Sequence, residues 1–197
     1  VETEDLVGYD IVRNNDGANV DENGELERKI RIVIDKIKDA KRPVIYAGNG
    51  VRISGAQDEL IKLASAVEIP VVTCWDSIDS MKTESDYYVG RAGIMGDRPG
   101  NFAVQNSDLV IAIGNRLNIY QVGYQLESWA REAYIVDVDI DELELQKKTI
   151  RVDLPICTDA TNFISKLLKV IADEKVEYST PKEWLEICKN WKLQYPV

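Results

Sequence analysis

Residues 91–117 read RAGIMGDRPGNFAVQNSDLVIAIGNRL, which predicts a glycine-rich loop, a short helix and a buried strand, in that order. Pro99 suits the first turn of the helix, where its missing N–H costs no hydrogen bond. Leu109 to Ile113 form a continuous apolar run, as expected for a parallel strand buried on both faces. Gly114-Asn115-Arg116 follows at the carboxyl end of that strand, where open α/β sheets bind their ligands. An arginine at this edge favours an anionic ligand.

The rest of the chain alternates between helical and strand-like patterns. Strands are expected at 44–47, 70–73, 88–90, 109–113 and 134–139, with a kinked edge strand formed by 150–152 and 155–156. Helices are expected at 26–40, 56–67 and 160–171, and another is expected to start at a cap around Thr180-Pro181. The pattern predicts the α/β class, as a doubly wound, six-stranded, mostly parallel Rossmann-like sheet.

Composition excludes several classes of function. The 197 residues carry a formal net charge of −10, which argues against nucleic acid and anionic membranes as partners. The chain contains no histidine, so histidine-based acid–base chemistry and most zinc sites are excluded. Its three cysteines are far apart and are expected to be reduced thiols of a cytoplasmic protein.

The chain is expected to divide into three segments, the last of them by the resemblance described below. Residues 1–24 are polar and predict a linker or extended segment from a preceding domain. Residues 25–175 form the Rossmann-like domain, and residues 176–197 form a helical connector toward a missing C-terminal domain. Trp184 and Trp191 share one face of that connector and are expected to pack, in part against the missing domain. Because the sequence lacks an initiator Met and ends abruptly at Tyr195-Pro196-Val197, the chain is expected to be a fragment of a longer polypeptide.

The turn after the first strand reads GNGVRISG over residues 48–55, which is not the G-x-G-x-x-G spacing of dinucleotide dehydrogenases. Glycines there allow a sharp turn and a close approach to a ligand. A ligand-contacting turn and a tight strand-to-helix turn without a ligand therefore both remain open.

Charged residues also gather at the predicted strand ends. Four arginines follow strands in this acidic chain and suggest an anion site: Arg52, Arg91, Arg98 and Arg116. A structural ion pair is the alternative, for Arg116 with Asp137 or Asp139, and a structural role is favoured for Arg98. Asp139 could accept ribose hydroxyls, whereas Asp141 is expected to cap the turn that follows.

The order of the motifs resembles one family, the central domain of thiamine diphosphate-dependent enzymes of the acetolactate synthase type. The matching pieces are KRPVIYAGNGV, IPVVTCWDSIDS, GRAGIMGDRPGNFAVQNSDLVIAIGNRL and IVDVDIDELELQK, with EWLEICKNWKLQYP resembling the tail that leads into the last domain of the family. The resemblance covers roughly residues 26–196. It implies a central domain between a pyrimidine-binding and a diphosphate-binding domain, in a homodimer or homotetramer that acts on a 2-oxo acid.

The same resemblance implies where the cofactors lie. Thiamine diphosphate and Mg²⁺ would be bound by the other two domains, and this chain has no Gly-Asp-Gly motif. No catalytic and no metal-binding residue is therefore assigned to it, and it is expected to be inactive alone. The family's FAD contacts, carried over by motif, fall on Gly48, Asn49, Gly50, Thr73, Cys74, Gly93, Ile94, Gly114, Arg116, Asp139 and Ile140.

One departure from the family weakens the case for FAD. FAD-binding members follow the arginine with an aromatic residue and Asp-Asp-Arg, whereas here Arg116 is followed by Leu117-Asn118-Ile119-Tyr120. FAD and ADP therefore both stay candidate ligands of the cleft. The alternatives are a structural or regulatory module with an empty cleft, or a stand-alone NAD-dependent enzyme on a related Rossmann-like fold. An NAD-dependent deacylase would need a catalytic histidine that this chain lacks.

Overall fold

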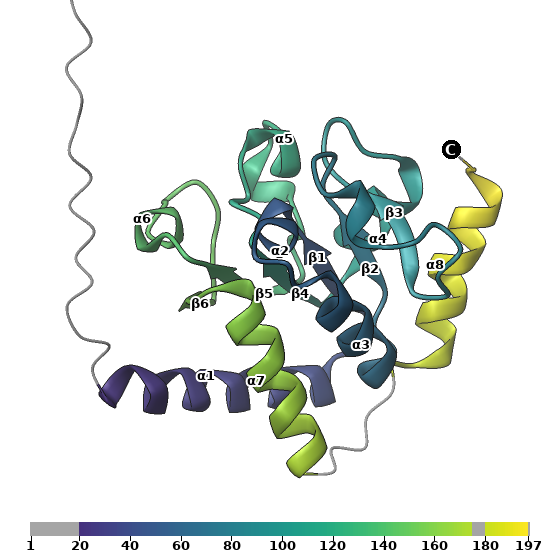
Figure 1. Cartoon of the computed structure of the whole chain (residues 1–197). Helices are drawn as coiled ribbons and strands as arrows, with labels where there is room; N and C mark the ends of the chain where they lie inside the picture. The colour runs from purple at the N-terminus through teal and green to yellow at the C-terminus, as the bar shows by residue number, and fades with distance from the viewer. Residues whose placement is uncertain (1–19, 175–179, 197) are drawn as a thin grey trace, which may run out of the picture.

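The computed structural model describes residues 20–174 and 180–196, and within them six parallel strands form one sheet in the order β3-β2-β1-β4-β5-β6 (Figure 1). The strands are β1 Pro43–Ala47, β2 Val71–Thr73, β3 Tyr88–Arg91, β4 Leu109–Ile113, β5 Tyr134–Asp139 and β6 Leu154–Cys157. The prediction of a six-stranded, mostly parallel α/β sheet is confirmed.

The order of the strands reverses between β1 and β4. β1 pairs with β2 on one side and, from Pro43 to Ala47, with Leu109 to Ile113 of β4 on the other. The connections after these two strands therefore leave in opposite directions. Such a reversal opens a crevice at the carboxyl ends of the strands, where sheets of this type hold ligands.

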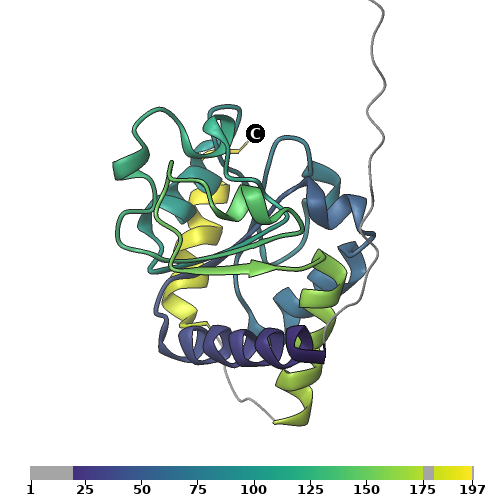
Figure 2. The ribbon, with the colours of Figure 1, turned by 90° about the vertical axis from the view of Figure 1, so that its left-hand side faces the viewer.

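Three helices cover one face of the sheet: α1 Val20–Asp39, α3 Gln57–Val67 and α7 Ala160–Asp173. Figure 2, with the β6 edge toward the viewer, shows α1 crossing beneath the sheet and α7 beside it. Every third or fourth residue of α1, such as Ile30, Val33 and Ile37, is buried against Ile45 and Ile111 of the sheet. This spacing places the apolar side chains of a helix on one side, so the helix forms where it can bury that side.

The opposite face is covered by α4 Arg98–Asn106 and α8 Lys182–Gln194, together with α5 Ile119–Val122 and the short 3₁₀ turn η2 Leu126–Ser128. Asp97 caps α4 by accepting a hydrogen bond from Gly100 N, and Pro99 lies in the first turn as expected. The remaining short elements lie in loops after strands: α2 Asn49–Ile53, η1 Ile78–Ser80 and α6 Glu142–Leu145.

Two predicted boundaries are wrong. Helix α1 begins at Val20, so residues 20–24 are helical rather than linker, while residues 1–19 lie outside the described part. The edge strand β6 begins at Leu154, and residues 150–152 are not part of it. Ile150 and Val152 pack against the core on the α4 side instead. Between them, the Arg151 guanidinium donates to Ala133 O at 2.6 Å. A side chain, and not strand pairing, therefore connects residues 150–152 to the start of β5.

The start and the packing of α8 also differ from expectation. Pro181 is the residue before the helix and no side chain caps it, while the Thr180 hydroxyl donates to Val67 O at 3.4 Å. Trp184 is buried and its indole N–H donates to Pro43 O at 3.0 Å. Trp191 packs edge-on against Phe102 of α4. Trp184 and Trp191 of α8 therefore pack against this domain itself.

Helix α8 also borders β3, an edge strand of the sheet. The Lys192 ammonium group donates to Tyr88 O at 2.8 Å and also contacts Thr83 O. It lies 5.4 Å from the centre of the Tyr88 ring. One lysine thus binds both a backbone carbonyl and the aromatic ring of an edge residue.

Candidate functional site

A cavity of about 390 Å³ opens at the carboxyl edge, at the reversal between β1 and β4. Its walls come from the segments that follow β1, β2, β4, β5 and β6. Six of the residues predicted to bind a ligand line it: Asn49, Gly50, Gly114, Arg116, Asp139 and Ile140. Segments far apart in the sequence therefore meet where the predicted site lies.

Three glycines let the turns after β1 and β4 cross in contact. Gly48 N donates to Ile113 O and Gly50 N donates to Gly114 O, each at 2.9 Å. A Cβ on Gly48 would lie 2.2 Å from Gly114 O, and one on Gly50 would lie 2.6 Å from the Cα of Gly114. Gly114 itself has a φ of +57°, a conformation that glycine adopts without cost. The glycines of the turn are thus required by backbone packing, whether or not a ligand is present.

The residues after Gly114 continue in an unusual conformation. Arg116 has a φ of +54° and Leu117 a φ of +42°, so two successive non-glycine residues are left-handed. Such a residue costs about 1–2 kcal/mol, which surrounding contacts must offset. The Leu117 side chain is buried, and Arg116 lines the cavity.

Arg116 is paired with α6 rather than with β5. Its guanidinium donates to a carboxylate oxygen of Glu144 at 2.5 Å, and the expected pairing with Asp137 or Asp139 is not found. Lys147 contacts the other oxygen of Glu144 and donates to Arg116 O at 3.1 Å. Arg116 pairs with Glu144 because α6 places this carboxylate beside the turn after β4.

Three residues that line the cavity each carry a buried side-chain oxygen with no hydrogen-bond partner among the described residues. Asn115 is 2% exposed, and its side-chain N–H donates to Tyr46 O at 3.2 Å, but its Oδ1 accepts nothing there. The buried Oδ1 atoms of Asn49 and Asp76 are in the same state. Buried polar atoms are nearly always paired, so three such acceptors in one cavity fit a ligand that donates hydrogen bonds.

The charges of the cavity are mostly negative. Asp76, Asp139 and Asp159 line it, and Arg116 is its one cation among the described residues. Asp159 accepts from the first backbone N–H groups of α7, and Asp139 accepts from Asp141 N at 2.9 Å. Asp141 caps α6, as predicted. Two of the three carboxylates therefore have structural partners, whereas the buried Oδ1 of Asp76 has none among the described residues.

A further carboxylate lies buried next to this site. Asp137 is 4% exposed, and its Oδ1 has no partner among the described residues. Burial, followed by the charge of Asp139, raises the pKa of Asp137 to about 7. Burial and the positive charge of Arg116 lower the pKa of Lys147.

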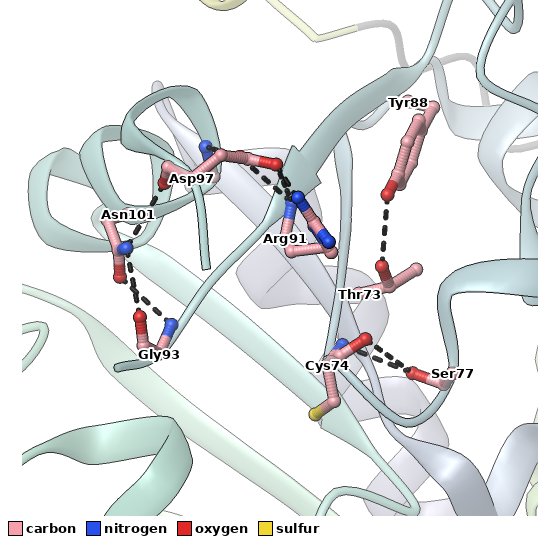
Figure 3. A network of polar contacts seen from close by, with 9 residues as sticks. Thr73, Cys74, Ser77, Tyr88, Arg91, Gly93, Asp97 and Asn101 are labelled. Atoms are coloured by element: carbon pink, nitrogen blue, oxygen red, sulfur yellow. Dashed lines mark hydrogen bonds and ion pairs between the residues drawn. The ribbon is translucent and has the colours of Figure 1, made fainter. Parts of the chain in front are cut away.

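The other five predicted residues lie outside the cavity lining. Gly48 takes part in the backbone crossing. Thr73 is buried, with its hydroxyl 3.2 Å from the Tyr88 hydroxyl (Figure 3). Cys74 is also buried, its N–H donates to the Ser77 hydroxyl, and burial raises the pKa of its thiol to about 12. All three cysteines are free thiols, as expected.

Gly93 and Ile94 belong to the loop after β3, which is held by its own polar network. Asp97 accepts hydrogen bonds from Arg91 N at 3.1 and 3.2 Å, and Asn101 brackets Gly93 through both of its side-chain polar atoms (Figure 3). Ile94 N donates to Tyr120 O at 2.8 Å, so the loop also rests on α5. Ile94 itself is half exposed.

The predicted arginine cluster is not one cluster. Arg52 pairs with Asp79 at 2.8 Å, Arg91 pairs with Asp97, and Arg98 lies over the ring of Tyr195. Only Arg116 of these four lines the cavity. The structural role expected for Arg98 agrees with its position.

Sequence reasoning missed Asp76 and Glu144. Asp76 follows the carboxyl end of β2, so the rule that found Arg116 and Asp139 could have found it. Glu144 lies in no motif, and its contact with Arg116 depends on where α6 folds. Among the described residues no group of His, Cys, Asp and Glu could hold a metal ion, and no helix is long and apolar enough to cross a membrane.

Comparisons with known proteins point to one family. Residues 30–167 match the family model for the central domain of thiamine pyrophosphate enzymes. The chain is 38% identical over 162 residues to a probable acetolactate synthase large subunit of Methanocaldococcus jannaschii, covering 82% of this chain. It is 33% identical over 169 residues to the acetolactate synthase large subunit of Corynebacterium glutamicum, covering 86% of this chain. The match spans only 27% of the length of either relative.

Proposed function

This chain belongs to the family of thiamine pyrophosphate enzyme central domains, and from that membership we propose that it is the non-catalytic middle part of a longer acetolactate synthase-like protein. In that protein residues 25–175 would form the central domain, and residues 176–197 would connect it to a diphosphate-binding domain. The whole protein would act on a 2-oxo acid in the cytoplasm, as a homodimer or homotetramer. The 27% share of its relatives' length supports the proposal that most of the activity lies outside this chain.

Thiamine diphosphate and Mg²⁺ do not fit the residues of this chain. The sequence has no Gly-Asp-Gly motif, and the described residues contain no cluster that could hold a metal ion. We therefore assign both to the flanking domains and derive no catalytic step from the residues present. The chain alone is expected to be inactive.

The cavity does fit part of a nucleotide, and this observation carries the proposed binding function. The unpartnered oxygens of Asn49, Asp76 and Asn115 can accept hydrogen bonds from ribose hydroxyls or an adenine amino group. Arg116 can bind a phosphate at the mouth of the cavity. ADP and FAD share both features, so the proposed ligand is a nucleotide of this class. When bound, FAD would add a flavin that absorbs visible light.

A second surface supports packing against other domains. Exposed apolar side chains gather on the loops that follow strands, at the same edge as the cavity: Ile53, Trp75, Ile78, Ile94, Met95, Ile119, Tyr120, Tyr124, Ile140 and Leu143. A large exposed apolar patch is typical of an interaction surface. We propose that the pyrimidine- and diphosphate-binding domains of the longer protein cover this edge.

Ligand-induced thermal stabilisation tests the binding function. ADP and FAD should each raise the melting temperature of the chain, because a ligand that binds only the native state stabilises it. Arg116→Ala should abolish most of that rise while the ligand-free protein stays folded. Arg52→Ala is the matched control, because Arg52 is also a surface arginine paired with a carboxylate but lies outside the cavity. Equal shifts in the parent and in Arg116→Ala would remove Arg116 from the site.

One observation favours the alternative of a structural module with an empty cleft. Three carboxylates line the cavity against one arginine, which disfavours a ligand with several phosphates. In that case neither ADP nor FAD would change the melting temperature at millimolar concentration. A purified full-length protein without visible flavin absorbance would agree with the same alternative.

A further inference from the structure

Arg116 is poorly held by its own turn. Its backbone has a left-handed conformation, as does that of Leu117. Its side chain is 66% exposed. An exposed arginine normally samples many rotamers, and binding an anion must then freeze them. A site that uses such an arginine gains affinity if other residues fix the guanidinium before the ligand arrives.

Glu144 and Lys147 supply that support from α6 and the residues just after it. The Glu144 side chain is only 11% exposed, so the shielded partner of the ion pair is the carboxylate. Its Oε1 accepts from the Arg116 guanidinium, and its Oε2 contacts the Lys147 ammonium group. Lys147 in turn donates to Arg116 O at 3.1 Å. The side chain and the main chain of Arg116 are therefore both held by one closed set of contacts.

The net charge of Arg116, Glu144 and Lys147 together is positive and still favours an anion. Lys147 neutralises Glu144, so the pairing with Glu144 does not cancel the positive charge of Arg116. A guanidinium has five N–H donors, and the contact with Glu144 leaves others for a phosphate. The carboxylate thus orients the arginine without replacing the ligand.

We infer that Glu144 and Lys147 are positioning residues, which hold the Arg116 turn in the form that binds the phosphates of a nucleotide. The inference rests on the proposed binding function of the cavity. It assigns a role to α6, which supplies Glu144 although this residue does not line the cavity. The pair acts on the phosphate end of the ligand, because Asn49 and Asp76 belong to other segments. Asn115 is adjacent to Arg116, but its side chain is held separately by the hydrogen bond to Tyr46 O.

The test compares ADP with adenosine, two ligands that differ only in the diphosphate, by calorimetric titration of the 197-residue chain. Glu144→Gln keeps the size of the side chain and removes its charge. It should weaken ADP binding about ten-fold, because charge-assisted hydrogen bonds are roughly twice as strong as neutral ones. Adenosine binding should stay unchanged. Lys147→Met should weaken ADP binding in the same selective way.

Two neighbours serve as matched controls. Glu142→Gln changes a carboxylate of the same helix that bonds Gln146 and not Arg116, and Lys148→Met changes the adjacent lysine. Neither should alter ADP binding. A merely structural role of Glu144 would instead lower the melting temperature of the ligand-free chain and weaken both ligands alike.

The outcomes separate this inference from the proposed function. Unchanged ADP binding in Glu144→Gln, or an equal loss for ADP and adenosine, would overturn the inference while leaving the binding site intact. Failure of the parent chain to bind either ligand would overturn the proposed function, and the inference with it.

Discussion

The loop after β3 and the turn after β4 both leave the carboxyl edge of the sheet, but they treat their polar groups in opposite ways. In the β3 loop both oxygens of Asp97 accept hydrogen bonds, and Asn101 uses both its oxygen and its nitrogen (Figure 3). Around the β4 turn, Asn49, Asp76 and Asn115 each have a buried oxygen without a partner in the described part of the chain. In the β3 loop the polar side chains therefore stabilise the loop itself, whereas around the β4 turn three acceptors are not used by the fold.

The glycines sharpen the same contrast. Gly100 in the first turn of α4 would place a Cβ 2.1 Å from Arg91 O, so the helix and the end of β3 touch through their backbones. The glycines of the β1 and β4 turns also touch, but the cavity opens beside them. A rigid loop therefore stands next to a cavity with unfilled hydrogen-bonding capacity, and the two should respond differently to substitution.

The largest effect is expected for Gly100→Ala. The clashing atom belongs to the backbone and cannot rotate away, so the substitution should cost about 3 kcal/mol or more of unfolding free energy. Gly55→Ala is the control, because Gly55 has a φ of +74° but nothing lies within 4 Å of its Cβ position. It should cost only about 1 kcal/mol. Urea unfolding of both variants measures the difference, and similar losses would contradict the close contact.

A direct comparison of the two regions comes next in size. Asp97→Ala removes the N-cap of α4 and the acceptor for Arg91 N, and should cost about 2 kcal/mol. Asn115→Ala removes one hydrogen bond to Tyr46 O and should cost about 1 kcal/mol or less, while weakening nucleotide binding. A larger loss of stability for Asn115→Ala would show that the cavity wall is structural.

The smallest effect concerns Asp137, whose pKa of about 7 in the folded chain lies above its ordinary value of 3.8. Between these values the folded state binds the proton more tightly than the unfolded state, so Asp137 lowers stability as pH rises from about 4 to 7. Asp137→Asn removes this loss. Relative to the parent, it should gain about 1 kcal/mol between pH 6 and pH 7 in urea unfolding. A constant difference over this range would contradict the raised pKa.

Much of the fold was predictable because burial leaves a simple pattern. The runs LVIAI and YIVDVD predicted β4 and β5 with the bounds that the structure has. LVIAI is the continuous apolar sequence typical of a strand buried on both faces, and in YIVDVD the apolar residues are interrupted by Asp137 and Asp139. Residues 150–152 were predicted wrongly because Ile150 and Val152 are also apolar and partly buried, yet they pack beside the sheet rather than within it. Burial alone does not distinguish these two fates.

The site was predictable at its strand ends and not beyond them. Gly50, Gly114, Arg116 and Asp139 follow from the rule that the carboxyl ends of parallel strands meet at one edge, whereas Asn49 was assigned through the family resemblance. The partner of Arg116 was predicted wrongly, because Asp137 and Asp139 are nearer in the pattern of strands, whereas Glu144 reaches it only through the path of α6. The spacing of residues in the sequence does not predict contacts of this kind, because they depend on how the connecting loop folds in space.

Lys192 has a consequence for the chain among its own copies. A strand at the border of a sheet offers free backbone groups to which a foreign strand can add, and such addition begins many aggregates. Here the ammonium group of α8 already occupies the outward carbonyl of Tyr88. An intruding strand would have to strip a charged group from its partner and displace a helix anchored by Trp184. The last helix thus helps to keep the β-sheet from growing across molecules.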